Sequence, residues 1–331
     1  MKGLVHKIFK NPEIGVLIPL VLIIAGFSLN EPDFLTPNNV SAILRSLAFV
    51  GIIAIGQTLI ILVAEIDISV GSVAGLGAII AAQLMTAAEL FVPVAILLAL
   101  LACALVGLVN GVLVNQARIP SFIATIGMLY IAKGVTYLIC HGNPIYPLPS
   151  SIEKLSMQEP FGTSWPFVLF IVLILVGDQM LRRTVAGRKL YATGGNAEVA
   201  KLAGINTILV KTGAFVACST LAGLAGILQM FQLNTGQPTI GLGWELMVIA
   251  STVVGGVSLL GGSGTILGTL IGVLILYSVQ NGLNFLNVNT HWETVAIGMI
   301  MILAVLVDML RRGRYASLAR FWDLVNQRIK K

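Results

Sequence analysis

Two carboxylates and a hydroxyl interrupt the apolar first third of the chain. Glu65, Asp67 and Ser69 lie in "GQTLIILVAEIDISVGSVAGLGA", residues 56–78, at a break between two apolar runs. Short polar side chains beside glycine are suited to capping a following helix, because their oxygens accept hydrogen bonds from its first N–H groups. Carboxylates within an apolar segment are also candidates for gating or for coupling to an ion. Both interpretations of Asp67 and Ser69 stay open, and so does the role of Glu65.

One basic side chain falls inside an apolar run. Lys133 lies in "GMLYIAKGVTYLI", about 20 Å from Pro120 at roughly 1.5 Å per helical residue. Charges within membrane segments are functional by default, so Lys133 either anchors its helix at the interface or lines a solute pathway. A lone lysine without an acidic relay argues against a proton-driven pump. Asn110 and Asn281, near the ends of apolar runs, are either helix caps or further pathway candidates.

A polar stretch in the middle of the chain, "GRKLYATGGNAEVAKLAGIN" at residues 187–206, predicts one short, capped helix. Asn196 is a favourable N-cap, Glu198 stands in the first turn where the helix dipole favours an acid, and Lys201 is spaced to pair with it. Gly204 supplies the left-handed residue that ends the helix. About seven residues give roughly 10 Å of helix, which is too short to cross a membrane.

The predicted helix is also too small to bury its own apolar side. Val199, Leu202 and Ala203 are therefore available to dock into a groove on a partner protein. The alternative is a helix that rests on the bilayer surface. The first interpretation predicts a protein partner at this loop, and the second predicts only lipid.

Motifs for enzyme chemistry are absent from the sequence. No Gly-Lys pair occurs, so the chain lacks the phosphate-binding loop G-x-x-x-x-G-K-[ST] and is not expected to bind ATP through one. The three histidines and three cysteines are isolated and give no zinc spacing, and no nucleophile elbow occurs. We therefore expect no catalytic residue, cofactor or metal in this chain.

Long apolar blocks must position these polar residues. Of the 331 residues, 57% are hydrophobic and 10% are charged, against roughly 25% charged in a soluble domain. Several blocks approach the ~20 residues that span a bilayer as a helix. The sequence therefore predicts an all-α, polytopic membrane protein with about ten transmembrane helices. They are expected near residues 14–29, 41–63, 73–88, 92–113, 120–140, 165–181, 207–231, 244–260, 265–283 and 292–309.

Lys and Arg residues divide unevenly between the two sides of the predicted helices. With the N-terminus inside, seventeen fall on the inner side and two, Arg45 and Lys154, fall on the outer side. Because cytoplasmic loops of membrane proteins carry the excess of Lys and Arg, both termini and the 182–206 loop are expected in the cytoplasm. The net charge of +6 follows from this asymmetry and indicates no nucleic-acid partner.

Five ordered motifs between about residues 35 and 310 resemble the permease subunits of ribose/galactose/autoinducer-2-type ATP-binding-cassette importers. "GQTLIILVAEIDISVGS" is similar to that family's G-x-T-x-V-I-x-x-G-G-I-D-L-S-V-G-S, and the 187–206 stretch is similar to its G-R-x-x-Y-A-x-G-G-N-x-x-A-A-x-x-x-G-I loop. "LGWELMVIASTVVGGVSLLGGSGTILGTLIG", "IPSFIATIGMLYIAKG" and "ILAVLVD" fit as well. The chain departs from the family at Val63-Ala64-Glu65, where small residues and glycine are usual, and at Lys133, where Arg is common.

The resemblance implies a type II importer-like permease, with residues 1–331 forming a single transmembrane domain in the bacterial inner membrane. It implies four partners: an ATPase subunit that binds ATP and Mg²⁺, a periplasmic or tethered sugar-binding protein, a second permease copy or paralogue, and membrane lipid. It also implies that residues 182–206 are the cytoplasmic coupling loop pressed against the ATPase. The coupling residues would be Gly194, Gly195, Asn196, Glu198, Val199, Lys201, Leu202 and Gly204.

Two functions from different classes fit these residues. In the first, the chain is the permease subunit of an importer that moves a small neutral solute, a monosaccharide or sugar-like molecule, into the cytoplasm. In the second, it is a secondary transporter coupled to ions through Asp67, Glu65 or Lys133. A need for a separate ATPase, with uptake that survives collapse of the proton gradient, distinguishes the first from the second. Related permeases carry pentoses, hexoses, autoinducer-2, inositols and nucleosides. The resemblance therefore implies a class of cargo and does not name the cargo itself.

Overall fold

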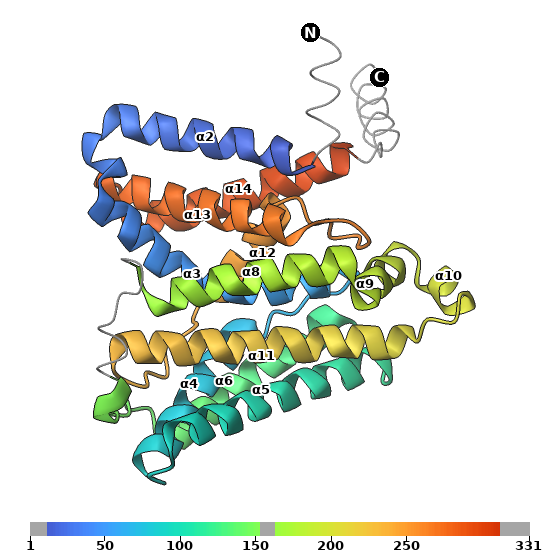
Figure 1. Ribbon diagram of the computed structural model, residues 1–331, viewed down its shortest axis with the longest axis horizontal. Helices are drawn as coiled ribbons and strands as arrows, with labels where there is room; N and C mark the ends of the chain where they lie inside the picture. The colour runs from blue at the N-terminus through green and yellow to red at the C-terminus, as the bar shows by residue number, and fades with distance from the viewer. Residues whose placement is uncertain (1–11, 153–162, 312–331) are drawn as a thin grey trace, which may run out of the picture.

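The computed structural model describes residues 12–152 and 163–311, and within them the chain is helical (Figure 1). Its elements are α2 (Pro12–Asn30), the short 3-10 helix η1 (Pro32–Leu35), α3 (Pro37–Leu62), α4 (Val70–Thr86), α5 (Val92–Asn115), α6 (Ser121–Cys140), α8 (Trp165–Arg183), α9 (Val185–Gly195), α10 (Ala197–Leu202), α11 (Thr207–Leu233), α12 (Trp244–Val254), α13 (Ile266–Phe285) and α14 (Thr290–Arg311). The predicted all-α class is confirmed for this part of the chain. The predicted cytoplasmic termini concern residues 1–11 and 312–331, which lie outside it.

Six helices of the described part are long and apolar enough to cross a membrane, namely α3, α5, α6, α8, α11 and α13. Four other predicted spans correspond to the shorter apolar helices Gly15–Asn30, Val70–Thr86, Trp244–Val254 and His291–Leu306. The count of about ten transmembrane helices is therefore not confirmed. The largest difference is at residues 244–260, because α12 ends after 11 residues at Val254 and a glycine-rich turn follows. At about 1.5 Å per residue, α12 covers roughly half of a bilayer core.

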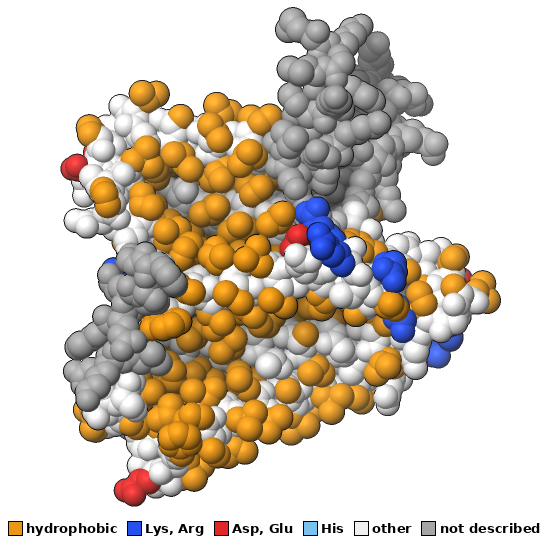
Figure 2. Space-filling view, in the orientation of Figure 1, with side chains coloured by type: hydrophobic (Ala, Val, Ile, Leu, Met, Phe, Trp, Pro, Cys, Tyr) orange, Lys and Arg blue, Asp and Glu red, His pale blue; other side chains and the backbone are white. Residues whose placement is uncertain are grey.

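Helices α3 and α11 form the centre of the bundle. Figure 1 shows α4, α5 and α6 on one side of α11, while α13, α14 and α2 are stacked on the other side. In the apolar 18-residue stretches of α3 and α11, 78% and 61% of the residues are buried inside the protein, whereas in those of α5, α6 and α8 only 22% to 28% are buried. The outer helices therefore expose apolar side chains, which cover the middle of the face seen in Figure 2. This arrangement is expected of a bundle whose outer surface contacts lipid.

Small residues let the helices approach one another closely. In α13, Gly268 and Gly272 pack on the end of α12, where an added side chain would overlap the carbonyl oxygens of Gly255 and Ser251. Helices in lipid associate through such close packing, because lipid tails are as apolar as the helix surfaces and provide little hydrophobic driving force. The four-residue glycine spacing of this segment thus serves helix packing.

Replacing Gly268 by leucine is expected to disrupt assembly of the bundle. Overpacking typically costs about 1–3 kcal/mol, and contact with backbone rather than with a flexible side chain leaves little room for relaxation. The yield of monodisperse protein after detergent extraction measures the effect. Gly127→Leu is the matched control, because Gly127 lies in α6 with no atom within 4 Å of an added Cβ. Equal yields from the two variants would remove the packing explanation.

Candidate functional site

The predicted short helix is present as α10. The Oδ1 atom of Asn196 accepts hydrogen bonds from the N–H groups of Glu198 and Val199, both at 3.0 Å, so the predicted N-cap is confirmed. Gly204 has a φ of +81°, which confirms the left-handed stop. One detail of the prediction is wrong, because no ion pair joins Glu198 to Lys201. The caps fix both ends of the helix without it.

A second helix, α9, precedes α10 and was not predicted. Thr184 caps it, since its hydroxyl oxygen accepts a hydrogen bond from the Gly187 N–H at 3.2 Å. Gly194 and Gly195 form its last turn. Glycine is a poor helix former, so local propensity argued against a helix across this pair. Tertiary packing of Gly194, described below, accounts for the difference.

The apolar side of α10 faces outward. Val199 is 59% exposed and Leu202 is 89% exposed, whereas Ala200 is buried. Figure 2 shows Lys and Arg side chains gathered at this end of the molecule. The exposed basic residues of α8, α9 and α10 are Arg182, Arg183, Arg188, Lys189 and Lys201. An apolar patch with a charged rim is the usual composition of a protein-docking surface.

Backbone atoms at the end of α9 contact two other segments, the end of α3 and the glycine-rich turn that follows α12. A side chain on Gly194 would overlap the carbonyl oxygen of Leu62, the last residue of α3. The same carbonyl accepts a hydrogen bond from the Gly262 N–H at 2.9 Å. Gly261 and Gly262 have φ values of +80° and +70°, which glycine adopts without strain. We call this contact of α9, the end of α3 and the turn 255–264 the glycine junction.

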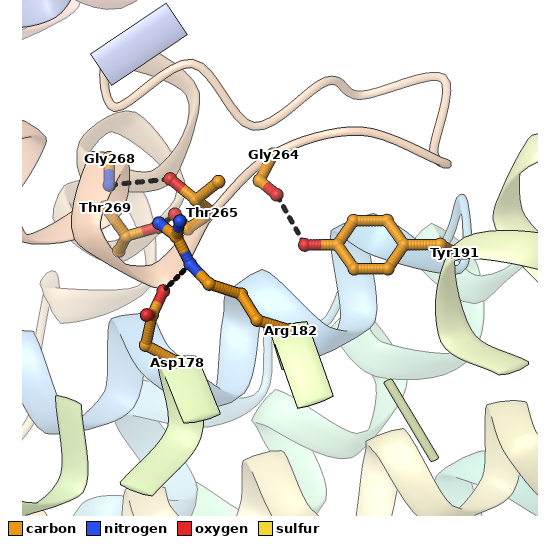
Figure 3. A network of polar contacts seen from close by, with 7 residues as sticks. All are labelled: Asp178, Arg182, Tyr191, Gly264, Thr265, Gly268 and Thr269. Atoms are coloured by element: carbon orange, nitrogen blue, oxygen red, sulfur yellow. Dashed lines mark hydrogen bonds and ion pairs between the residues drawn. The ribbon is translucent and has the colours of Figure 1, made fainter. Parts of the chain in front are cut away.

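Side chains extend the glycine junction to α13. Figure 3 shows Tyr191 reaching from α9 to the start of α13, where its hydroxyl donates to the carbonyl oxygen of Gly264 at 2.8 Å. Thr265 follows directly and caps α13. One turn further on, the hydroxyls of Thr269 and Thr58 lie 2.7 Å apart and join α13 to α3. The helices α3, α9 and α13 are therefore connected at one end of the bundle.

Glu65 forms an ion pair beside the glycine junction. Its Oε1 atom lies 2.5 Å from the Nζ atom of Lys211 near the start of α11, and the two side chains are 14% and 20% exposed. The preceding residue, Ala64, has a φ of +61°, which is strained for any residue with a Cβ. In this chain the glutamate ties the segment 63–69 to α11.

Charge reversal at Glu65 is expected to destabilise the protein, and charge exchange to restore it. Glu65→Lys brings two cations together in a mostly buried place, and a hydrogen bond to a charged group contributes about 1.5–3 kcal/mol. Adding Lys211→Glu rebuilds an oppositely charged pair. Thermal unfolding in detergent across this double-mutant cycle measures the interaction. Lys201→Glu, at an exposed charge on α10, is the control, and a double variant no better than the sum of its parts would contradict the pairing.

Asp67, Ser69 and Asn110 come together in a buried network. The Oδ1 atom of Asp67 accepts from the Ser69 N–H at 2.8 Å and from the Ser69 hydroxyl at 2.6 Å. The Nδ2 atom of Asn110 on α5 donates to Ser69 Oγ at 3.1 Å. Ser69 holds the predicted N-cap position of α4, but its side chain makes no capping hydrogen bond. The network instead fastens the segment before α4 to α5, and a part in gating stays a prediction.

Lys133 has an acidic neighbour that the sequence did not single out. It is partly buried on α6 and lies within electrostatic range of Glu245 in the first turn of α12. Glu245 in turn packs on Gly71 of α4, where an added side chain would overlap the carboxylate. Lys133 therefore has one acid in its surroundings, and its part in anchoring or in a pathway stays a prediction. The available signal was an acid in the otherwise apolar stretch "LGWELMVIA".

A polar cavity of about 410 Å³ lies between α3, α11, α12 and α13, at the ends of these helices away from α10. The rings of Phe49 and Trp244 on its wall are nearly parallel, with centroids 6.1 Å apart and an interplanar angle of 15°. Amides, a serine, a tyrosine and short apolar side chains complete a wall without any charged residue. The lining residues are Ala42, Ile43, Ser46, Phe49, Gln229, Gln232, Trp244, Tyr277, Gln280, Asn281 and Asn284.

Asn281 is the predicted pathway candidate that lines this cavity, whereas Glu65, Asp67, Ser69, Asn110 and Lys133 are not part of its wall. Its amide exchanges two hydrogen bonds with the amide of Asn39, both at 2.9 Å. The sequence did not select the glutamines of the wall. Their spacing was the available signal, because Gln229 and Gln232 are three residues apart and share one helix face.

Comparisons with known proteins agree on one group. The family model for "Branched-chain amino acid transport system / permease component" matches residues 39–305. The chain is 40% identical to the ribose import permease protein RbsC of Escherichia coli (strain K12) over 296 residues, which is 88% of this chain and 92% of the relative. It is 37% identical to the L-arabinose ABC transporter permease protein AraH of Azospirillum brasilense over 300 residues, covering 91% and 88%.

A more distant relative is the autoinducer 2 import system permease protein LsrC of Photorhabdus luminescens. It is 33% identical to the chain over 298 residues, which cover 90% of each protein. No solved structure matches the chain. The similarity therefore rests on sequence, and the family match at residues 39–305 includes the 182–206 loop, the glycine junction and the cavity.

Proposed function

The chain belongs to the family of permease components of branched-chain amino acid transport systems, and from this we propose that it is the permease subunit of an ATP-binding-cassette importer. The proposed cargo is a small neutral solute, a monosaccharide or sugar-like molecule. Relatives named for ribose, L-arabinose and autoinducer 2 support this cargo class, and so does a cavity wall without charge. ATP hydrolysis is assigned to a separate subunit.

The observation that carries the proposal is an exposed, capped helix mounted on a rigid support. α10 offers Val199 and Leu202 to a partner, and α9 behind it contacts Leu62 and Gly262 through backbone atoms. A contact of this kind cannot be lost by rotation of a side chain. Residues 182–206 therefore have the properties of the coupling loop through which an ATPase would move the permease.

Two helices would carry that movement to the cavity. α3 runs without a break from Phe49 on the cavity wall to Leu62 at the glycine junction, about 20 Å at roughly 1.5 Å per residue. α13 begins beside Tyr191, and Asn284 in its last turn lies on the same wall. A displacement of α9 then shifts two walls of the cavity together. In this way ATP-driven closure on the partner changes the space available to cargo.

The proposed assembly contains a second permease copy or paralogue, ATPase subunits with ATP and Mg²⁺, and a periplasmic or tethered sugar-binding protein. We place the chain in the bacterial inner membrane as a single permease domain, with both termini and residues 182–206 in the cytoplasm. The Lys and Arg side chains at the α9–α10 end support this orientation. A type II importer-like architecture would include the shorter helices α2, α4, α12 and α14 beside the six long spans.

The double variant Val199→Asp, Leu202→Asp is expected to weaken docking of the ATPase. Burying two such side chains contributes on the order of 3 kcal/mol, so their loss lowers affinity by about a hundredfold. Co-purification of the ATPase with the permease measures it. Val199→Ile, Leu202→Met keeps the apolar surface and is the matched control. Undiminished recruitment and normal uptake in the Asp variant would mean that α10 rests on lipid instead.

Uptake is expected to require the ATPase and to survive collapse of the proton gradient. Radiolabelled ribose, arabinose and allose entering proteoliposomes that hold the assembled complex are measured with and without a protonophore. Omitting ATP should abolish uptake, whereas the protonophore should leave it within about twofold. Uptake that persists without the ATPase and stops with the protonophore would identify an ion-coupled secondary transporter.

A further inference from the structure

We propose that the polar cavity is a cargo-binding site inside the permease, and that it recognises the hydroxyl-rich ring of a neutral monosaccharide with free amides and one aromatic wall. The proposal rests on the proposed function and adds to it a place and a mode of recognition. The volume of about 410 Å³ lies in the range of about 300–1,000 Å³ that small-molecule sites occupy.

Hydrogen bonding divides the amides of the wall into two groups. The side-chain amide of Asn281 forms two hydrogen bonds with that of Asn39, so it holds α13 against α3 and is not assigned to cargo binding. Within the part of the chain that the structure describes, the side chains of Gln229, Gln232 and Asn284 have no hydrogen-bonding partner. Gln232 and Asn284 are exposed and Gln229 is partly exposed at this wall, so their amides are free to form hydrogen bonds with water or with a polar solute.

Gln280 is oriented by a contact behind the wall. Its Nε2 atom donates to the Oε2 atom of Glu293 at 3.2 Å, and Glu293 is buried. The carbonyl oxygen of Gln280 is thereby left as an acceptor for the cavity. The wall then offers acceptors and donors together, which matches a sugar because each hydroxyl both donates and accepts.

The aromatic side of the cavity is held in place from behind. Phe49 is 3% exposed and supports the ring of Trp244 in a nearly parallel arrangement. An indole face is apolar, and the C–H face of a sugar ring is its complement. Trp244 begins α12, and the next residue packs on Gly71, so the indole is carried by a fixed helix start.

The absence of charge from the wall sets the specificity. A sugar phosphate or sugar acid would bring an anion to a site where no lining residue is a cation. Removing an ion from water without a partner is strongly unfavourable, so such derivatives are excluded. A neutral sugar meets amides and an aromatic face instead.

The first experiment measures uptake by the complete complex of this chain, its ATPase and its binding protein in proteoliposomes. Ribose, arabinose and allose are tested to find the sugar that the parent complex imports. The variant Gln232→Leu, Asn284→Leu should then lower uptake of that sugar at least tenfold, while the complex still assembles. Gln179→Leu is the matched control, because Gln179 is exposed on α8 outside the cavity.

The outcomes separate the two levels of proposal. A parent complex that imports none of the three sugars would overturn the proposed monosaccharide cargo and this site with it. A parent that imports sugar, with a cavity variant equal to the Gln179 control, would overturn the site alone. A variant that loses assembly together with uptake would mark Gln232 and Asn284 as packing residues and would also overturn the site.

A second measurement does not depend on transport. Gln232→Cys in the full chain should react with a neutral, water-soluble maleimide, and the imported sugar at saturation should slow the reaction at least threefold. The native Cys103, Cys140 and Cys218 are buried and give a low background. Gln179→Cys serves as control, and its rate should not change with sugar. Equal rates at Gln232→Cys with and without sugar would overturn the proposal.

Discussion

The contact between α9 and the rest of the bundle depends on the carbonyl oxygen of Leu62. Leu62 is the last residue of α3, and its carbonyl oxygen accepts a hydrogen bond from the Gly262 N–H at 2.9 Å and lies directly against Gly194. A methyl group on either glycine would separate α9 from α3 or from the turn before α13. Because packed backbone segments have few alternative arrangements, we expect the junction to move as one unit. In the proposed function, the exposed α10 acts on distant helices through this unit.

Polar side chains within the bundle differ in whether the protein itself satisfies them. Glu65 is held by Lys211, and Asn281 by Asn39, so these groups stabilise contacts between helices. Among the described residues, the side chains of Gln229 and Gln232 have no hydrogen-bonding partner on the cavity wall, where Gln232 is exposed and Gln229 partly exposed. Their amide donors and acceptors are therefore open to whatever enters the cavity. In the proposed site, this difference separates the amides that hold helices together from those that meet solute.

Features that depend on neighbouring residues, such as helix caps, could be predicted from the sequence, whereas contacts between residues far apart in the sequence could not. Asn196 and Gly204 fixed the ends of α10 because capping depends on neighbouring residues alone. The length of α12 was missed because hydropathy continues past Val254, while the glycines after it bend the backbone. The last turn of α9 was missed because packing at Gly194 overrides propensity. The cavity was missed because its amides come from helices far apart in the sequence.

The uninterrupted course of α3 has a thermodynamic consequence. One rigid helix touches the cavity with Phe49 and the glycine junction with Leu62, so occupancy at one end and docking at the other belong to a single equilibrium. Coupling free energies are reciprocal: the factor by which docking alters affinity for solute equals the factor by which solute alters affinity for docking. In the proposed importer, solute in the cavity is therefore an allosteric effector of subunit assembly as well as cargo. The state of the junction that the filled cavity favours would be the state to which the ATPase binds most tightly.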